Sequence, residues 1–382
     1  MKKYDYIILG SGLSGLLTAY RMATDTWFYD KSILIIDQKI KNQNDRTWCF
    51  WEEPNGEFDS ILSKTWEKAF IGNQDFQQSF EMHPYLYKMI RSSDFYKLVF
   101  DSISSKSNFT LINDEIFSWK TIEDSVEVQG KNQTYSGSSL LNSFFDVNPL
   151  FNQKKYPYLK QHFIGWFIKT KAEIFDDSEV KFMDFTIEQD GNTRFMYVLP
   201  TSKTEALFEY TLFSEDLLEI TEYEKAIQNY LQNLGITDYE IVEKEAGNIP
   251  MTCFPFHKQN SERVLFIGTA GGWTKASTGF TFFNSKKQTE KLVEFLKTNQ
   301  NLSKFHQKNR YWFYDLILLE VLHQNNELGA QLFGTLFKKN SIQNIFQFLN
   351  EEGTISSDLK VMLTLPKWLF IKATFRALWK LV

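Results

Sequence analysis

Tyr6-Ile7-Ile8-Leu9-Gly10-Ser11-Gly12-Leu13-Ser14-Gly15 decides the fold, because in it an apolar strand pattern passes directly into a glycine-rich turn. Residues 16–22 continue with a pattern typical of a helix, and residues 32–36 form a second apolar run that ends at Asp37. Strand, GxGxxG turn, helix, strand and acidic residue therefore follow one another. This order is typical of a dinucleotide-binding βαβ unit.

Each glycine of this turn has a physical role. Gly10 permits the tight turn, Gly12 lets the backbone approach a pyrophosphate, and Gly15 lets helix and strand pack closely. The helix N-terminus offers free N–H groups to phosphate, and the carboxylate of Asp37 can accept hydrogen bonds from a ribose. The alternative is a glycine-rich turn in an unrelated α/β fold. The residues from which we expect cofactor contacts are Gly10, Ser11, Gly12, Ser14, Gly15 and Asp37.

The remainder of the chain indicates a nucleotide domain that is interrupted by a β-rich insert. Helical patterns cover residues 93–103, 221–234 and 281–297, and short strand patterns cover 109–144, 162–170, 180–188, 193–199 and 205–213. After residue 264 a buried strand again opens onto a glycine-rich turn that begins at Gly268. We predict an α/β protein with three parts: a Rossmann-type domain (1–45, 91–150 and 260–300), an inserted mixed β-sheet substrate domain (46–90 and 151–259), and a helical C-terminal region (301–382).

Composition excludes several classes of protein. The chain has 382 residues, of which 43% are hydrophobic and 23% charged, so it is neither disordered nor fibrous. A net charge of −5 argues against nucleic acid as a partner. The cysteines, Cys49 and Cys253, cannot form a disulfide framework, and the histidines lack the spacing of metal ligands, so we expect no metal site. We expect neither a signal peptide nor a membrane-spanning helix.

The C-terminal end has a different charge from the rest of the chain. From Leu359 to Val382 there are basic residues but no acidic one. Lys372, Arg376 and Lys380 recur every four residues, and a broad apolar stripe is formed by Trp368, Ile371, Phe375, Leu378, Trp379 and Val382. Basic and apolar stripes on one helix are typical of a helix that lies in a bilayer interface. The alternative is a terminal helix that packs its apolar face on the protein.

Motifs spread over most of the chain resemble those of the bacterial lycopene beta-cyclases, a family of flavoproteins with a hydroxylase-like fold. The early motifs are Arg46-Thr-Trp48-Cys-Phe50-Trp and Gln161-His-Phe163-Ile-Gly165-Trp166. The central motifs are Phe182-Met-Asp184-Phe185, Phe195-Met-Tyr197-Val-Leu-Pro200 and Ala206-Leu-Phe208-Glu209-Tyr-Thr211-Leu-Phe213. The late motifs are Gly247-Asn-Ile-Pro250-Met251, Gly268-Thr-Ala270-Gly-Gly-Trp-Thr274-Lys-Ala-Ser-Thr278-Gly279-Phe280 and Tyr314-Asp315-Leu-Ile-Leu-Leu319. The combination of the first, fifth and last large motifs is specific to this family.

The resemblance implies a cofactor, a substrate and a location. The cofactor would be FAD in its reduced form, with NADPH as the reductant, and we expect Gly268, Thr269, Thr278 and Gly279 to contribute to its site. The substrate would be lycopene or another carotenoid with acyclic ends, and the product of lycopene would be β-carotene. The protein would be peripherally bound to the cytoplasmic side of a membrane. Gly268-Thr269-Ala270 replaces the Gly-Asp-Ala that flavin hydroxylases usually carry, which favours a cyclase.

Lycopene cyclisation needs an acid aimed at carbon, a cavity free of water, and negative charge near a carbocation. Glu209 is the first candidate for the catalytic carboxyl, because it lies in an apolar strand where burial would raise its pKa. The alternative is an edge glutamate that pairs with Lys203. Asp184 and Glu245 are secondary candidates, each of which can also be structural. The sequence leaves open whether Glu209 or the flavin is the proton donor. Competing functions are a flavin-dependent monooxygenase, a prenyl-lipid reductase and a carotenoid-binding protein without enzymatic activity.

Overall fold

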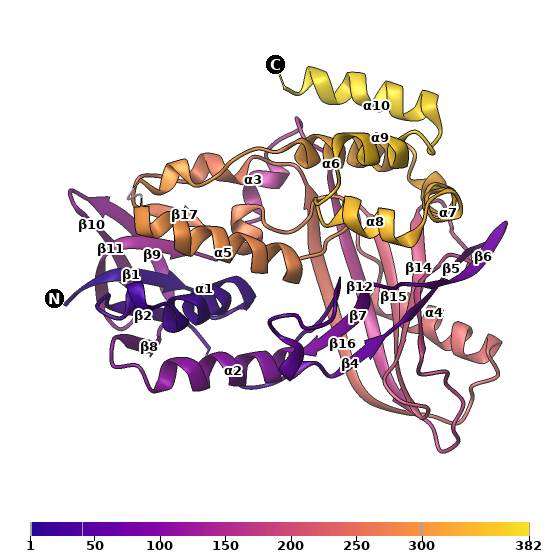
Figure 1. Cartoon of the computed structure of the whole chain (residues 1–382), viewed down its shortest axis with the longest axis horizontal. Helices are drawn as coiled ribbons and strands as arrows, with labels where there is room; N and C mark the ends of the chain where they lie inside the picture. Colours follow the sequence, from indigo (N-terminus) through magenta and orange to yellow (C-terminus); the bar gives the residue numbers. More distant parts are fainter. Residues whose placement is uncertain (1, 40, 299–300, 382) are drawn as a thin grey trace.

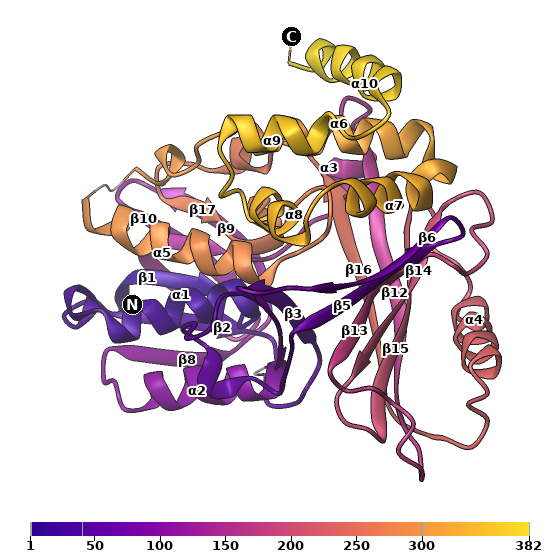
Figure 2. The same ribbon diagram turned by 45° about the vertical axis from the view of Figure 1, so that its right-hand side comes forward.

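Three β-sheets and a group of C-terminal helices make up the computed structural model, which describes residues 2–39, 41–298 and 301–381 (Figure 1). One large sheet contains the N-terminal strand, and a second large sheet lies on the opposite side of the molecule. A small sheet lies between them, and the helices after residue 310 lie along one side of the sheets (Figure 2).

The N-terminal sheet has a parallel centre, as the βαβ pattern predicts. Its strands run in the order β8-β2-β1-β11-β10-β9, and β17 pairs with the second half of β11. The bounds are β1 Lys3–Leu9, β2 Ile33–Asp37, β8 Phe109–Asn113, β9 Ile116–Ile122, β10 Ser125–Gly130, β11 Thr134–Asn142 and β17 Val264–Phe266. Apolar side chains pack this sheet against α1 Leu13–Thr24, α2 Ser92–Ser104 and α5 Phe282–Thr298. Pairing of β17 with β11 brings the late glycine turn beside the early one.

The second large sheet is mixed and carries the strands of the β-rich insert. Its order is β16-β12-β15-β14-β13-β5-β6, in which only β13 and β5 are parallel neighbours. The bounds are β5 Lys68–Asn73, β6 Phe76–Glu81, β12 Tyr158–Lys169, β13 Glu179–Asp184, β14 Thr193–Pro200, β15 Glu205–Ser214 and β16 Glu240–Thr252. One face packs on α4 Ile220–Asn233, and the other faces the C-terminal helices. Short α3 Asn148–Phe151 precedes β12.

A small sheet joins the two large ones. It consists of β3 Thr47–Glu52, β4 Lys64–Trp66 and β7 Leu86–Arg91, in the order β3-β7-β4. Lys88 of β7 is fully buried, and its ammonium contacts Glu52 Oε2 at 3.2 Å and Asp59 Oδ1 at 2.5 Å. Glu52 also pairs with Lys286 of α5 at 2.5 Å. This chain of charges fixes the small sheet to the N-terminal domain.

The last part of the chain is helical, as predicted. Its helices are α6 Arg310–Gln324, α7 Gly329–Lys339, α8 Ile342–Leu349, α9 Ile355–Met362 and α10 Lys367–Trp379. Helix α10 lies on the outside of this layer and packs mainly on α6 (Figures 1 and 2). Val382, the last residue of the predicted apolar stripe, lies outside the described residues. Among the described residues, none of the helices is both long and apolar enough to cross a bilayer.

Two groups of strands have no clear signal in the sequence. Residues 46–90 contain five strands, although their periodicity is weak. Strand β16 is the longest strand of the described residues, but its first half mixes glutamate and lysine with Ile241, Val242 and Ala246, so the sequence does not indicate a buried strand. It lies at the edge of its sheet, where one partner strand is enough and half of the side chains face water.

We predict that Lys88→Ala lowers the free energy of unfolding by about 2–5 kcal/mol, because it removes a fully buried side chain and leaves the half-buried Asp59 without its cation, while Glu52 keeps Lys286. Urea unfolding at neutral pH measures this loss. Lys97→Ala is the matched control, since Lys97 forms an exposed pair with Asp101 that is worth less than about 1 kcal/mol. Equal losses in the two variants would contradict a structural role of the buried charges.

Candidate active site

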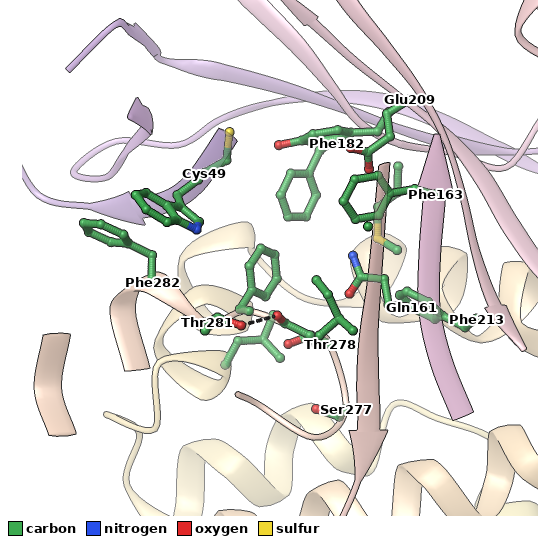
Figure 3. A pocket seen from close by; sticks show the side chains of 18 of the residues that line it. Cys49, Gln161, Phe163, Phe182, Glu209, Phe213, Ser277, Thr278, Thr281 and Phe282 are labelled. Carbon is green, nitrogen blue, oxygen red and sulfur yellow. Dashed lines mark hydrogen bonds between the residues drawn. The ribbon is translucent and has the colours of Figure 1, made fainter. Parts of the chain in front are cut away.

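A single cavity of about 560 Å³ connects the parts of the fold. It begins at Gly12 and Leu13 in the first glycine turn, passes Thr269 and Gly279 of the second, and reaches Glu209 of the inserted sheet. Figure 3 shows Glu209 pointing into this space, with Cys49, Phe163 and Gln161 around it. The sequence placed these segments in separate motifs, and the fold brings them to one site.

The first glycine turn leaves an open space at the start of α1, which we call the phosphate cradle because free N–H groups at a helix N-terminus suit a phosphate. Gly10 has a left-handed φ of +93°, and a Cβ at Gly15 would lie 2.0 Å from the carbonyl oxygen of Gly10, so both positions require glycine. A Cβ at Gly12, by contrast, would have no atom within 4 Å. Gly12 caps α1 without a side-chain hydrogen bond, which leaves the first N–H groups of the helix to a ligand.

Of the other predicted cofactor residues, Ser11 and Asp37 lie together beside the turn, whereas Ser14 contacts α5. Ser11 donates hydrogen bonds from its backbone N–H (2.6 Å) and its hydroxyl (2.7 Å) to Asp37 Oδ2, so the acid is held at the end of β2 beside the turn. Ser14 is buried and its hydroxyl hydrogen-bonds to that of Ser285 at 3.1 Å. Ser14 therefore joins α1 to α5, and its side chain does not point into the cradle.

The second glycine turn and strand β12, which lies beside it, each contribute a polar atom that lacks a partner. A Cβ at Gly279, where φ is +72°, would lie 2.0 Å from Gln161 Oε1. The atoms Thr278 Oγ1 and Gln161 Oε1 are buried, line the cavity and have no hydrogen-bond partner among the described residues. Buried polar atoms without partners are rare in native proteins, and a polar ligand explains them. Together with the phosphate cradle, these residues fit a dinucleotide cofactor that extends from Gly12 to Thr278.

A buried ion cluster fixes this second turn to the helical region. Lys275 is buried and pairs with Asp315 Oδ1 at 3.0 Å and with Glu351 at 3.2 Å. The hydroxyl of Ser277 donates a hydrogen bond to Asp315 Oδ1 at 2.7 Å. The Tyr314-Asp315 motif noted in the sequence thus holds the glycine turn in place.

Two carboxyl groups meet across a glycine in the inserted sheet. Gly165 of β12 stands opposite Glu209 of β15 on one side and opposite Glu245 of β16 on the other. A Cβ at Gly165 would lie 3.2 Å from Glu245 Cγ and 3.5 Å from Glu209 Cβ, so both side chains lie on its face of the sheet. Tyr197 of β14 stands opposite Glu209 on the far side and extends the row. The missing side chain at Gly165 leaves the space between the two carboxyls.

Burial makes both carboxyls weak acids. Glu209 is only 7% exposed, and burial together with the neighbouring Glu245 charge raises its pKa to about 8. Burial raises the pKa of Glu245 to about 7, although a hydrogen bond from Thr47 and the charge of Arg91 act in the opposite direction. Thr211 Oγ1 donates to Glu209 Oε1 at 2.6 Å, and Thr47 Oγ1 donates to Glu245 Oε2 at 2.8 Å. The pair can therefore hold a proton near neutral pH.

Neutral polar groups surround the carboxyl pair. The hydroxyls of Tyr87 and Tyr197 hydrogen-bond to each other, and Cys49 borders the same part of the cavity. Burial raises the pKa of the Cys49 thiol and of both tyrosines, so all three are neutral at pH 7. Apart from these groups the walls are mainly apolar, with many phenylalanines such as Phe182 and Phe337. The carboxyl pair therefore faces a mainly apolar space.

Sequence reasoning placed some residues of this region and missed others. Glu209 shares its face with Leu207, Thr211 and Phe213, as the alternation predicts, whereas Lys203 pairs with Glu173 and not with Glu209. Asp184 lies outside the cavity, where it accepts hydrogen bonds from Tyr230 and Thr186. The site residues that the sequence did not single out are the polar Thr47, Cys49, Tyr87 and Tyr197, and Gly165. In the sequence, nothing marks these residues except that all but Tyr87 lie within the motifs of the family resemblance.

Comparisons with known proteins agree with this architecture. The fold resembles a geranylgeranyl bacteriochlorophyll reductase-like protein from Thermoplasma acidophilum (TM-score 0.62, 10% identity, 98% of this chain and 100% of the other). It also resembles the flavin-dependent brominase Bmp2 (0.60, 11%, 94% and 97%). A third likeness is to p-nitrophenol 4-monooxygenase PnpA from Pseudomonas putida (0.57, 12%, 98% and 99%). At these identities the likeness shows the fold alone.

The sequence itself identifies the family. The comparison with curated proteins gave no match. The family model described as lycopene cyclase protein, however, matches residues 5–378, which is nearly the whole chain. That range includes both glycine turns, the carboxyl pair and most of α10. The chain therefore belongs to the lycopene cyclase family.

Proposed function

We propose that the protein closes the acyclic ends of lycopene into β-ionone rings and so forms β-carotene, in a reaction without net redox change that requires reduced FAD. The observation that carries this proposal is the carboxyl pair of the buried Glu209 and the half-buried Glu245, which line an apolar cavity continuous with the dinucleotide cradle. An apolar polyene fits such walls, and a carboxyl that stays protonated at neutral pH is the acid that the reaction needs.

The proposed step is an isomerisation, so its atoms balance without a co-substrate. The proton of Glu209 adds to the terminal double bond of lycopene and leaves a tertiary carbocation. The next double bond attacks this cation and forms the carbon–carbon bond of the ring. The ionised Glu209, or Glu245 beside it, then accepts a proton from the carbon next to the cation, and the new double bond forms there. The ionised Glu209 balances the positive charge at close range in a medium of low dielectric constant, where such stabilisation is strong.

Glu245 supports this step as the second member of the pair. Its charge disfavours ionisation of Glu209 and thereby keeps Glu209 protonated to a higher pH. When Glu209 has given up its proton, Glu245 is the nearby group that can hold one, because its own pKa is close to 7. The apolar walls exclude water, which would trap the cation as an alcohol.

The residues that would hold FAD are those of the two glycine turns. Gly12 and the N-terminus of α1 would receive the pyrophosphate, Asp37 the ribose, and Thr269, Thr278 and Gly279 the flavin end. Reduced FAD, with NADPH as its reductant, would place an electron-rich ring near the carbocation. It would also be an alternative donor of the proton. The chain's own contribution is the arrangement of the carboxyl pair beside it.

A prenyl-lipid reductase or a monooxygenase is the second candidate, since the fold is shared with a reductase-like protein and with a monooxygenase. The family match favours the cyclase. Anaerobic incubation with lycopene and reduced FAD, followed by pigment chromatography, separates the two. With a cyclase, the amount of NADPH consumed does not rise with the amount of β-carotene formed. With a reductase, one NADPH is consumed in each turnover.

We predict that Glu209→Gln retains FAD but lowers ring closure by at least about a hundredfold, because an amide can neither donate a proton nor balance a cation. Product is measured by chromatography and FAD by absorbance of the purified protein. Glu205→Gln, on the same strand but in a partly exposed pair with Lys169, is the control and should remain active. Normal activity of Glu209→Gln would exclude Glu209 from the mechanism.

We predict that the activity of the native protein falls as the pH rises through about 8, because the reaction needs protonated Glu209. Glu245→Gln removes the neighbouring negative charge and so lowers the pKa of Glu209. The alkaline limb of the pH profile of kcat should therefore move to lower pH in this variant. Glu240→Gln, an exposed residue on the same strand, should leave the profile unchanged. An unchanged limb in Glu245→Gln would show that the carboxyls act independently.

We predict that Gly12→Val abolishes FAD binding while the protein stays folded. The new side chain enters the phosphate cradle, where a Cβ meets no protein atom within 4 Å. Flavin absorbance after purification and the thermal unfolding midpoint are the two measurements. Gly15→Val provides the contrast, since its Cβ would lie 2.0 Å from a backbone oxygen and should cost stability as well. Flavin retained by a folded Gly12→Val would contradict the assignment of the cradle.

A further inference from the structure

Large apolar side chains are exposed at the C-terminal end of the chain. Trp368 is 78% exposed, Phe375 63% and Trp379 80%. Ile371, Leu378 and Leu363 are exposed as well. Continuous apolar surfaces of this kind are uncommon on soluble proteins and mark contacts with partners or lipid. We call the outward side of residues 359–381 the α9–α10 face.

The packing of α10 explains why these side chains point outward. The helix rests on the protein through small residues, Ala373 and Ala377, which are buried, and Lys380 reaches the buried Glu320 of α6 at 2.5 Å. At 100° per residue, Trp368, Phe375 and Trp379 lie on the side opposite these two alanines. The sequence left open whether the apolar stripe covers the body of the protein, and in the structure it does not.

The charges beside the exposed stripe are of one sign. Lys372 and Arg376 are exposed along one side of the apolar arc, and Lys367 lies on the other side. From residue 359 to 381 the sequence has no acidic residue, although the chain as a whole has a net charge of −5. A basic and aromatic face on an acidic protein is complementary to an anionic lipid surface. It is not complementary to itself, because two copies that met face to face through it would bring like charges together.

The inner side of the same segment lines the cavity. Its walls include Val361 and Met362 at the end of α9, Leu365 in the α9–α10 turn, and Phe370 of α10. Leu363 and Trp368 of the same stretch are exposed on the outside. A few residues therefore separate the apolar cavity from the α9–α10 face.

We propose that the α9–α10 face docks on an anionic bilayer and that the turn between these helices is the portal by which an apolar chain passes from the bilayer into the cavity. The identity of that chain as a carotenoid rests on the proposed function, whereas docking does not. The arrangement spares a water-insoluble substrate any passage through water, because the portal opens on the surface that contacts lipid.

Co-sedimentation of the purified full-length protein with vesicles tests docking without any catalysis. We expect binding to vesicles with 30% phosphatidylglycerol, weak binding to pure phosphatidylcholine, and loss at high salt. Lys372→Gln/Arg376→Gln should weaken binding about thirtyfold, at about a tenfold change per 1.4 kcal/mol and about 1 kcal/mol per basic residue. Trp368→Ser/Phe375→Ser should weaken it as well. Point substitutions are preferable to truncation, because loss of α10 would uncover Glu320 and the core of α6.

Matched controls change exposed residues elsewhere. Phe117→Ser/Val242→Ser removes apolar side chains that are similarly exposed, and Lys131→Gln/Lys171→Gln removes the same number of charges. Both should bind vesicles like the native chain. Brominated lipids should quench the native tryptophan fluorescence, and Trp368→Phe/Trp379→Phe should lose this quenching while it still binds. Equal binding by all variants, or a dimer held together through this face, would overturn the proposal.

The portal is tested by the form in which substrate is supplied. In the docking variants, cyclisation of lycopene embedded in vesicles should fall at least tenfold, while cyclisation of detergent-dispersed lycopene stays within twofold of the native value. Equal losses in both assays would overturn the portal. If the native protein binds vesicles through this face but does not cyclise lycopene in either form, docking stands and the proposed function fails.

Discussion

The close approach of two carboxyl groups in an apolar cavity is the constraint on which the site depends. Burial of a carboxylate is costly, and two that face each other cannot both ionise at neutral pH without a further cost. The sheet permits their approach because Gly165 has no side chain, so that the side chains of Glu245 and Leu207 lie over its Cα, where a Cβ would meet them at 3.2 and 2.9 Å. The result is a proton held at neutral pH by groups that would be ionised in water.

This arrangement has a consequence for stability. The pKa values of Glu209 and Glu245 are raised on folding, so the neutral form is favoured in the folded state. The stability that these groups contribute is therefore complete below their ordinary pKa of 4.5 and declines as pH rises through about 7 to 8. Other parts of the fold must offset this cost. The buried ion clusters around Lys88 and Lys275 hold the parts of the cavity wall together but carry their own desolvation cost, so the large apolar core is the main source of stability.

The sequence predicts the dinucleotide domain well because its signals are local. The apolar run before Gly10, the spacing of the glycines and the acid at Asp37 all depend on neighbours in the chain, and the structure places them as expected. The carboxyl pair is different, since Glu209 and Glu245 belong to strands that are separated by α4 and meet only through β12. Gly165 has no local peculiarity of conformation, and only the register of the sheet reveals what its missing side chain permits. Strand β16 was missed for a related reason, because an edge strand shows half its residues to water.

The C-terminal region shows where pattern reasoning gives the right residues but an incomplete picture of their roles. The periodicity of residues 366–382 identifies both stripes, yet it cannot say which one faces the protein. Packing decides this: Ala373 and Ala377 let α10 lie close to α6, and Lys380 turns inward to Glu320 instead of joining the exposed basic residues. The aromatic side chains are left outside, over a turn whose other side lines the cavity. A cavity that must exclude water during catalysis and yet receive an apolar substrate is best served by a wall whose outer side is itself in lipid, since opening such a wall admits hydrocarbon and not water.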